Sequence, residues 1–245
     1  MPMSNALGSF LKKRLLRKDQ NLVSTDDPYE VMKRLLSRHS VTGILDAGAS
    51  NGRISLRLLR LFPKATAYAF EPNPFYRETL THKAEADPRL RPQFLALSDR
   101  EGSVPLHIAQ SPGISSFFTP SQSLKRLYPE DSTIRETVHV EAVTVDDWAS
   151  RAGVKSIELM KFDIQGAELM ALQGAEKMLA TVTLAIYSEL LFNTLYEGDA
   201  LYSQIDLFLR KAGFVLFDFF KPRYNGQGRL LWANALFLHS ARMAM

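Results

Sequence analysis

A short apolar run that leads straight into a glycine-bearing turn constrains the fold of this chain more than any other feature. The run covers 43–46, the turn lies within 47–52, and a helix is expected over about 52–61. A second apolar run, 66–70, comes next. Strands that alternate with helices in this way predict a parallel sheet whose connections are helices.

The residues of this turn are suited to a nucleoside cofactor. The turn reads Asp-x-Gly-x-x-x-Gly from Asp46 to Gly52, and Glu71 follows the second strand 19 residues after Gly52. Glycines let the backbone approach a ligand, and a carboxylate at that distance can bind both ribose hydroxyls. The missing middle glycine and the negative charge of Asp46, which repels a pyrophosphate, favour S-adenosylmethionine over a dinucleotide. Asp46 is then expected to bind the cationic end of the methionine moiety.

The rest of the chain extends the α/β pattern. Further strands are expected at 93–97, 157–162 and 182–187, helices at 28–39, 74–85, 166–179 and 200–212, and a closing hairpin at 214–219 and 231–238. We predict a Rossmann-like, seven-stranded, mostly parallel sheet with an antiparallel edge hairpin, N-terminal helices and an insertion after strand three. The expected division is a basic helical extension, 1–40, and one domain, 41–245, with the insertion at about 100–143.

Composition and charge narrow the function classes. The chain has no cysteine, which excludes disulfides, thiolate metal sites and a cysteine nucleophile. No apolar run reaches the roughly 18 residues of a membrane span, and no signal-peptide pattern is present, so we expect a soluble, cytoplasmic protein. Residues 1–20 carry five basic residues against one acid, while the remainder is close to neutral. Nucleic-acid binding is therefore not expected.

The basic segment has apolar residues at helical spacing between 7 and 18. Two interpretations stay open, a weak contact with a membrane surface and a helix that packs its apolar side on the domain.

Acidic residues follow the ends of five expected strands. They are Asp46, Glu71, Asp99, Asp163 and Glu189. Ligands of parallel α/β sheets bind outside the carboxyl ends of the strands, so five acids in that layer favour a ligand with amines and hydroxyls. Asp163 and Glu168 flank a turn at Gly166. They can form a pair that serves as a general base or binds a substrate or metal, or they can cap the next helix.

Several motifs together resemble the FkbM family of S-adenosylmethionine-dependent methyltransferases. They lie in order over residues 41–240, at 44–52, 70–74, 96–99, 115–116, 143–148, 161–169 and 172–175. The run Lys-x-Asp-x-Gln-Gly-x-Glu that begins at Lys161 is the most specific of them. The chain departs from many members at Ser50-Asn51, where they have Asn and a variable residue.

The resemblance implies a class I methyltransferase fold and methyl transfer to a hydroxyl of a sugar, glycan or secondary metabolite, with S-adenosylhomocysteine as the second product. It places Asp46, Gly48, Ala49, Asn51 and Gly52 at the methionine end, Glu71 and Asn73 at the ribose, Ser98 and Asp99 at the adenine, and Asp163 beside the sulfonium.

A hydroxyl acceptor holds its proton tightly, so a base is useful. Asp163, Glu168 and His139 are the catalytic candidates, and we favour Asp163. The five histidines have no metal-ligand spacing. An acidic cluster near the acceptor is able to bind Mg²⁺, although no metal ligand is assigned.

Other functions remain open at this point. An RNA or protein methyltransferase has the same fold, and so does a docking module without activity. An NAD-dependent oxidoreductase is disfavoured by Asp46 and the missing glycine. The sequence leaves the oligomeric state undetermined.

Overall fold

A seven-stranded sheet lies at the centre of the computed structural model, which describes residues 26–243. The strands run in the order β3-β2-β1-β7-β8-β10-β9. Their bounds are β1 Gly43–Ala47, β2 Thr66–Phe70, β3 Leu90–Gln93, β7 Leu159–Phe162, β8 Ala185–Leu191, β9 Phe214–Tyr224 and β10 Leu230–His239. β10 alone runs opposite to the other six strands of this sheet, so it pairs antiparallel with both β8 and β9. The predicted mostly parallel sheet with an antiparallel edge hairpin is confirmed.

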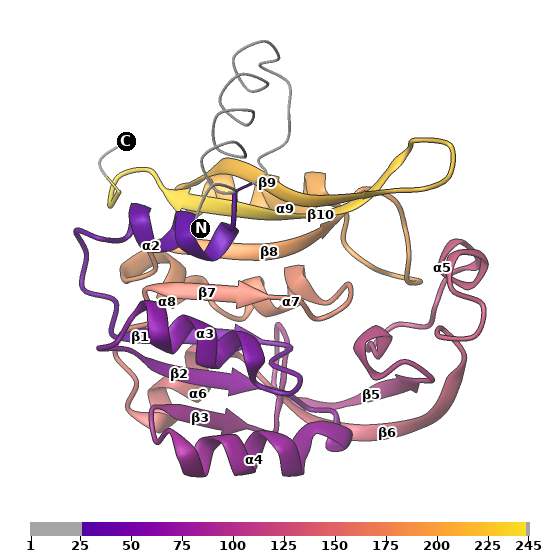
Figure 1. Ribbon diagram of the computed structural model, residues 1–245, viewed down its shortest axis with the longest axis horizontal. Helices are drawn as coiled ribbons and strands as arrows, with labels where there is room; N and C mark the ends of the chain where they lie inside the picture. Colours follow the sequence, from indigo (N-terminus) through magenta and orange to yellow (C-terminus); the bar gives the residue numbers. More distant parts are fainter. Residues whose placement is uncertain (1–25, 244–245) are drawn as a thin grey trace, which may run out of the picture.

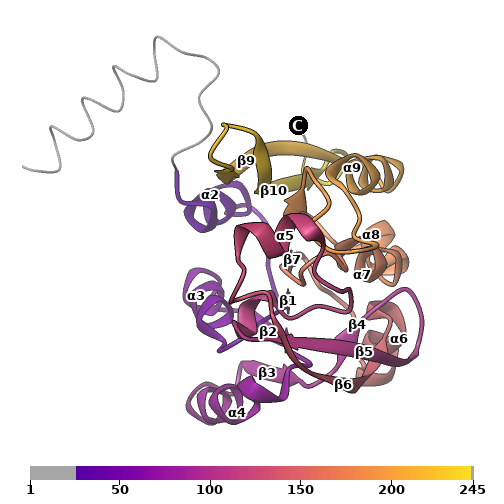
Figure 2. The same cartoon turned by 90° about the vertical axis from the view of Figure 1, so that its right-hand side faces the viewer.

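Helices cover both faces of the sheet (Figure 2). One face carries α2 (Pro28–Leu35), α3 (Arg53–Leu61) and α4 (Arg77–Ala86), and the other carries α6 (Val145–Ala152), α7 (Glu168–Gln173), α8 (Glu176–Thr181) and α9 (Tyr202–Lys211). Each face of the sheet buries its own apolar cluster, because successive strand residues point to opposite sides. In β1, Ile44 packs toward α3 and Leu45 packs toward the opposite helices.

The insertion forms a second, three-stranded sheet beyond the carboxyl ends of the parallel strands (Figure 1). It consists of β4 (Ala96–Leu97), β6 (Ile134–Val143) and β5 (Gly102–Ala109) in that order, with η2 (Pro112–Ile114) and α5 (Gln122–Leu127) between β5 and β6. The single strand expected at 93–97 is therefore wrong. The chain leaves the main sheet after Gln93 and re-enters a different sheet at Ala96.

Other expected elements differ in their bounds. The helix expected at 166–179 is interrupted at Gly174, where a Cβ atom would lie 2.1 Å from the Ser98 carbonyl oxygen. The helix expected at 74–85 begins as a short 3-10 turn, η1 (Pro74–Tyr76), before α4. Strand β8 continues to Leu191, so Glu189 lies inside the strand instead of after it.

The basic segment 7–18 and most of the expected extension 1–40 lie outside the described residues. Within residues 26–243, every helix is too short or too polar to cross a bilayer.

Candidate active site

The turn after β1 adopts the conformation that its glycines permit. Gly48, Ser50 and Gly52 have positive φ angles of 72°, 51° and 75°. A Cβ atom on Gly48 would lie 1.9 Å from the backbone oxygen of Asp163, so no other residue fits there. The turn thereby brings the end of β1 against the end of β7 and leaves space above both.

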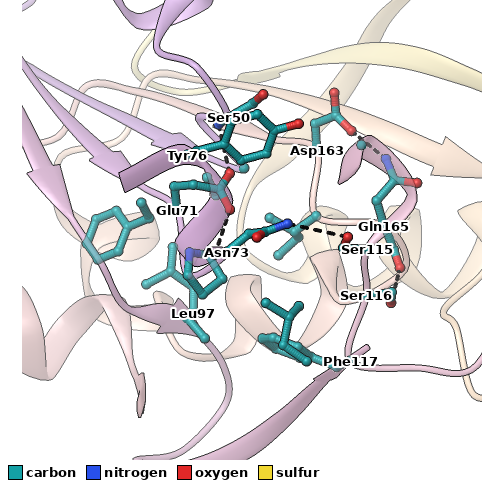
Figure 3. Close-up of a pocket in the computed structure, with 18 of the residues that line it drawn as sticks. Ser50, Glu71, Asn73, Tyr76, Leu97, Ser115, Ser116, Phe117, Asp163 and Gln165 are labelled. Carbon is teal, nitrogen blue, oxygen red and sulfur yellow. Dashed lines mark hydrogen bonds between the residues drawn. The ribbon is translucent and has the colours of Figure 1, made fainter. Parts of the chain in front are cut away.

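A cavity of about 230 Å³ occupies this space (Figure 3). One part of its wall is apolar and includes Leu95, Leu97, Leu106 and Phe117, all from the insertion or the segment that leads to it. Its polar groups come from the turn, the end of β2, the end of β7 and the η2 region, and they include Ser50, Glu71, Asn73, Ser115, Ser116, Asp163 and Gln165. An apolar slot beside a carboxylate suits an adenosine.

The Glu71 side chain lies at the centre of the cavity wall, and Glu71 is only 6% exposed. Its Oε2 accepts a hydrogen bond from the Ser50 N–H at 2.7 Å, and its Oε1 accepts one from the Asn73 N–H at 2.9 Å. Burial raises the pKa of this carboxyl above its usual range. Each carboxylate oxygen keeps further lone pairs, which suits it to accept hydrogen bonds from a vicinal diol.

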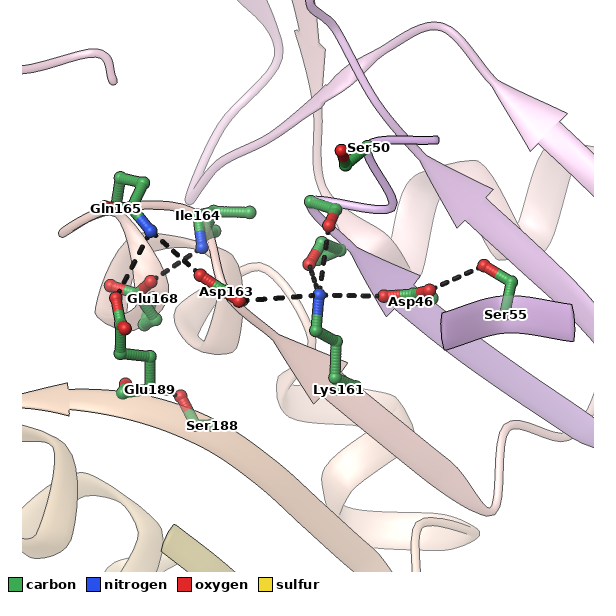
Figure 4. A network of polar contacts seen from close by, with 12 residues as sticks. Asp46, Ser50, Ser55, Lys161, Asp163, Ile164, Gln165, Glu168, Ser188 and Glu189 are labelled. Carbon is green, nitrogen blue, oxygen red and sulfur yellow. Dashed lines mark hydrogen bonds and ion pairs between the residues drawn. The ribbon is translucent and has the colours of Figure 1, made fainter. Parts of the chain in front are cut away.

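A buried polar network lies beneath the turn (Figure 4). Lys161 Nζ is 3.0 Å from Asp46 Oδ1 and 4.0 Å from Asp163 Oδ2, and it donates hydrogen bonds to the carbonyl oxygens of Ala47 and Gly48. The nearby carboxylates raise the pKa of Lys161 despite the opposing effect of burial, so the amine stays charged. It ties the ends of β1 and β7 together.

This network corrects the expected role of Asp46. Asp46 is fully buried, its Oδ2 accepts a hydrogen bond from Ser55 at 2.5 Å, and it is absent from the cavity wall. Its carboxylate neutralises Lys161, because a buried amine without a counter-ion is costly. Asp46 therefore positions the turn and does not reach the methionine end.

Asp163 and Gln165 form the end of the cavity that lies opposite the apolar slot. The Gln165 side-chain amide donates to Asp163 Oδ1 at 2.9 Å and to Glu189 Oε2 at 3.3 Å, while its oxygen accepts from the Tyr196 hydroxyl at 2.7 Å. Gln165 has a φ of 55°, an unusual value for a residue with a side chain. Its backbone oxygen accepts from Ser116 Oγ at 2.7 Å, which joins the insertion to β7.

Glu168 lies behind this loop instead of in the cavity. Its two carboxylate oxygens accept hydrogen bonds from the N–H groups of Ile164 (2.8 Å) and Gly166 (2.9 Å), and Glu168 is 2% exposed. Burial raises the pKa of Glu168 from 4.5 to about 7. Of the two readings left open above, the structure supports the structural one, in which Glu168 shapes the loop.

This pKa predicts a pH-dependent stability. The unfolded chain releases the Glu168 proton near pH 4.5 and the folded protein near pH 7, so stability falls as pH rises between these values. The total fall from this group is about 3 kcal/mol. Chemical denaturation across that range should show it in the wild type, and Glu168→Gln should lack it. The exposed Glu176→Gln is the control, and identical profiles for Glu168→Gln and wild type would contradict the assignment.

Of the residues predicted to bind the cofactor, some line the cavity and others lie outside it. Gly48, Glu71, Asn73 and Asp163 line the cavity, whereas Ala49, Asn51, Gly52, Ser98 and Asp99 do not. Asn51 is exposed and its Oδ1 accepts the Arg53 N–H at the start of α3. Ser98 donates its N–H to Val143, and its Oγ to Asp99, so this pair closes the insertion sheet instead of meeting an adenine.

His139 also lies outside the cavity. It lies on β6 opposite Pro105, on the exposed side of the insertion sheet. Its neighbours Val138 and Val140 are more buried, as the alternation of a strand requires. The expectation that His139 acts in catalysis has no geometric support.

Several cavity residues escaped the sequence interpretation. They are Ser50, Tyr76, Leu97, Leu106 and Gln165. The apolar ones carry no chemical signal, because an apolar residue of a strand is expected in a core. Gln165 lies in the most specific motif, and its position two residues after Asp163 was the available signal. Within residues 26–243, no group of three or more His, Asp or Glu side chains is arranged to hold a metal ion.

The strand order and the position of the cavity are those of the class I, Rossmann-like methyltransferase fold. The fold is shared with the methyltransferase FkbM from Methylobacillus flagellatus KT, at a TM-score of 0.51 and 15% identity over 81% of this chain and 44% of that one. Residues 46–216 match the methyltransferase FkbM domain. The chain therefore belongs to the FkbM methyltransferase family, which confirms the resemblance seen in its motifs.

Named relatives agree with this membership. The chain is 35% identical over 160 residues to the 2-O-methyltransferase NoeI of Sinorhizobium fredii, a match that covers 63% of this chain and 65% of NoeI. It is 30% identical over 198 residues to the methyltransferase sdnD of Sordaria araneosa, covering 70% of this chain and 73% of sdnD. The match thus spans slightly less than two thirds of the length of NoeI.

Proposed function

We propose that this protein transfers the methyl group of S-adenosylmethionine to a hydroxyl of a sugar, a glycan or a secondary metabolite. The observation that carries the proposal is the Glu71 carboxylate, which faces a cavity with an apolar slot on one side and Asp163 at the other end. The name of the relative NoeI, a 2-O-methyltransferase, supports an oxygen acceptor.

The residues present fit this cofactor. Glu71 would hold the ribose diol, Leu97 and Phe117 would enclose the adenine, and the Gly48–Ser50 turn would hold the methionine end. Bound there, S-adenosylmethionine supplies a methyl carbon that a positive sulfur already activates.

The chain then has to orient an acceptor and receive its proton. On this proposal the acceptor hydroxyl would arrive at Asp163. Its carboxylate is fixed by Gln165 on one oxygen and faces Lys161 with the other. With the cofactor bound, the acceptor oxygen would take the methyl carbon as the bond of that carbon to sulfur breaks, and Asp163 would accept the hydroxyl proton. The products are the methyl ether and S-adenosylhomocysteine.

Asp163→Asn tests this assignment. The amide keeps the size of the side chain but cannot take the proton, so kcat should fall at least about 100-fold. Calorimetry should show micromolar S-adenosylhomocysteine binding by the wild type and nearly equal binding by the variant. An unchanged kcat would exclude Asp163 as the base, and a wild type that binds neither cofactor nor product would exclude the enzyme.

Two alternatives have distinct signatures. An RNA or protein methyltransferase would bind the cofactor but label a macromolecule instead of a sugar. A docking module on the same fold would bind no cofactor at all. We propose a small-molecule or glycan acceptor, without nucleic acid, because the chain beyond residue 20 carries nearly balanced charge.

A further inference from the structure

A row of polar side chains continues across the sheet from the end of the cavity. Lys161 pairs with Tyr187 in the register of β7 and β8, and residues two positions later share the same face. Asp163 and Glu189 therefore lie side by side, and the Gln165 amide that donates to both confirms it (Figure 4). Glu189 in turn pairs with Asn234 of β10. The row runs Asp163, Glu189, Asn234.

An aromatic residue borders this row. Trp232 precedes Asn234 by two residues on the same strand and so shares its face. The ring of Tyr128, which follows α5 of the insertion, lies 6.4 Å from the Trp232 ring at an interplanar angle of 55°. Trp232 thus stands between the main sheet and the insertion, at the same end of the molecule as the cavity.

Two polar side chains of this region have no hydrogen-bond partner among the described residues. Asp163, Glu189, Asn234 and Trp232 all have intermediate exposure. Within residues 26–243, neither the Asn234 amide nor the Trp232 indole N–H has a hydrogen-bond partner, although most polar side chains around them are bonded. Of these four residues only Asp163 lines the cavity, and the unpartnered Asn234 and Trp232 extend the same surface with polar groups that are open to a ligand.

We propose that Asp163, Glu189, Asn234 and Trp232 form an acceptor shelf that binds a neutral sugar, with the hydroxyl to be methylated placed at Asp163. This inference rests on the proposed methyl transfer and names its substrate class. From Asp163 to Asn234 the shelf crosses two strand spacings, about 10 Å, which suits a sugar ring and its substituents.

The chemistry of the shelf matches a sugar. The flat apolar face of an indole packs against the C–H groups of a pyranose ring, while an amide offers both a donor and an acceptor to vicinal hydroxyls. Burial and the neighbouring Asp163 and Glu168 carboxyls raise the pKa of Glu189 well above its usual range. An anionic group beside the Asp163 carboxylate would be repelled, so the shelf favours a neutral ligand.

The test uses a panel of methyl glycosides of neutral hexoses and deoxyhexoses with methyl-labelled S-adenosylmethionine. We expect the full chain to label at least one sugar. Asn234→Ala should raise the KM for that sugar about 10-fold, the effect of losing hydrogen bonds to two hydroxyls, and leave S-adenosylhomocysteine affinity unchanged. Trp232→Leu should raise KM similarly. Asn234 has no partner to lose, so its variant should fold normally.

Two matched variants serve as controls. Phe217→Ala removes a ring that is 40% exposed on the neighbouring strand β9, and Gln227→Ala removes an exposed amide from the β9–β10 turn. Both should leave KM unchanged.

Each contrary outcome has its own meaning. A labelled sugar whose KM is insensitive to Asn234 and Trp232 overturns the shelf. If the protein binds the cofactor but labels no sugar, the proposed sugar acceptor is wrong, whether or not RNA or protein is labelled. A wild type that binds no S-adenosylhomocysteine overturns the proposed function, and the shelf with it.

Discussion

Glu71→Ala is expected to weaken S-adenosylhomocysteine binding about 100-fold, measured by calorimetry. The two ribose hydroxyls would each lose a hydrogen bond to a carboxylate, worth at least about 1.5 kcal/mol apiece, and the two losses together correspond to that factor. The variant also frees the Ser50 and Asn73 N–H groups that Glu71 holds, so the turn above β1 loosens. Both effects act on the cofactor and neither acts on the acceptor.

Asp99→Ala is the control for this prediction. Asp99 is an acid at the end of an apolar run, as Glu71 is, and its sequence motif implies an adenine contact. It is absent from the cavity wall, so its removal should leave the affinity unchanged. Equal losses in the two variants would show that the cofactor does not lie in this cavity.

Lys161→Met should destabilise the fold by about 3–5 kcal/mol, the usual cost of removing one partner from a buried ion pair. Lys161 is 5% exposed and lies between Asp46 and Asp163, so its loss leaves Asp46 buried without a counter-ion. Urea denaturation measures the effect directly. A loss below about 1 kcal/mol, the range of surface pairs, would contradict the network.

A second variant separates charge from packing. Adding Asp46→Asn to Lys161→Met removes the uncompensated carboxylate, so the double variant should regain much of the lost stability. If the two losses add instead, the methionine is disturbing the packing between β1 and β7 and the ion pair contributes little.

The alternation of apolar strands and helices was sufficient to predict the main sheet, because hydrophobic period and connection type determine a parallel α/β fold. The same pattern gave a wrong prediction where an apolar run lines the cavity instead of forming a strand of the main sheet. Leu95 and Leu97 have the composition of a strand, but they form the wall of the apolar slot, and the chain changes sheets between Gln93 and Ala96.

A site residue could be predicted where local backbone geometry determines its position. It could not be predicted where a partner distant in the sequence determines its role. Gly48 and Glu71 could be placed at the cavity from the sequence because turn conformation and strand-end position are local properties. Asp46 was misassigned because Lys161, its partner, lies more than a hundred residues away in the chain and meets it only across two adjacent strands. Whether His139 lies on the buried or the exposed face of its strand likewise depends on which face of the insertion sheet packs against the domain.

The insertion lines the cavity and also contacts the strand that carries the proposed shelf. It supplies Leu106, Ser115 and Phe117 to the cavity, and it places Tyr128 against Trp232. Exchanging this segment between relatives in order to change which compound is methylated would therefore also alter cofactor affinity. Chimaeras made for that purpose should keep 106–117 from the parent and vary only the α5 region, so that selectivity can be redesigned without rebuilding the nucleoside pocket.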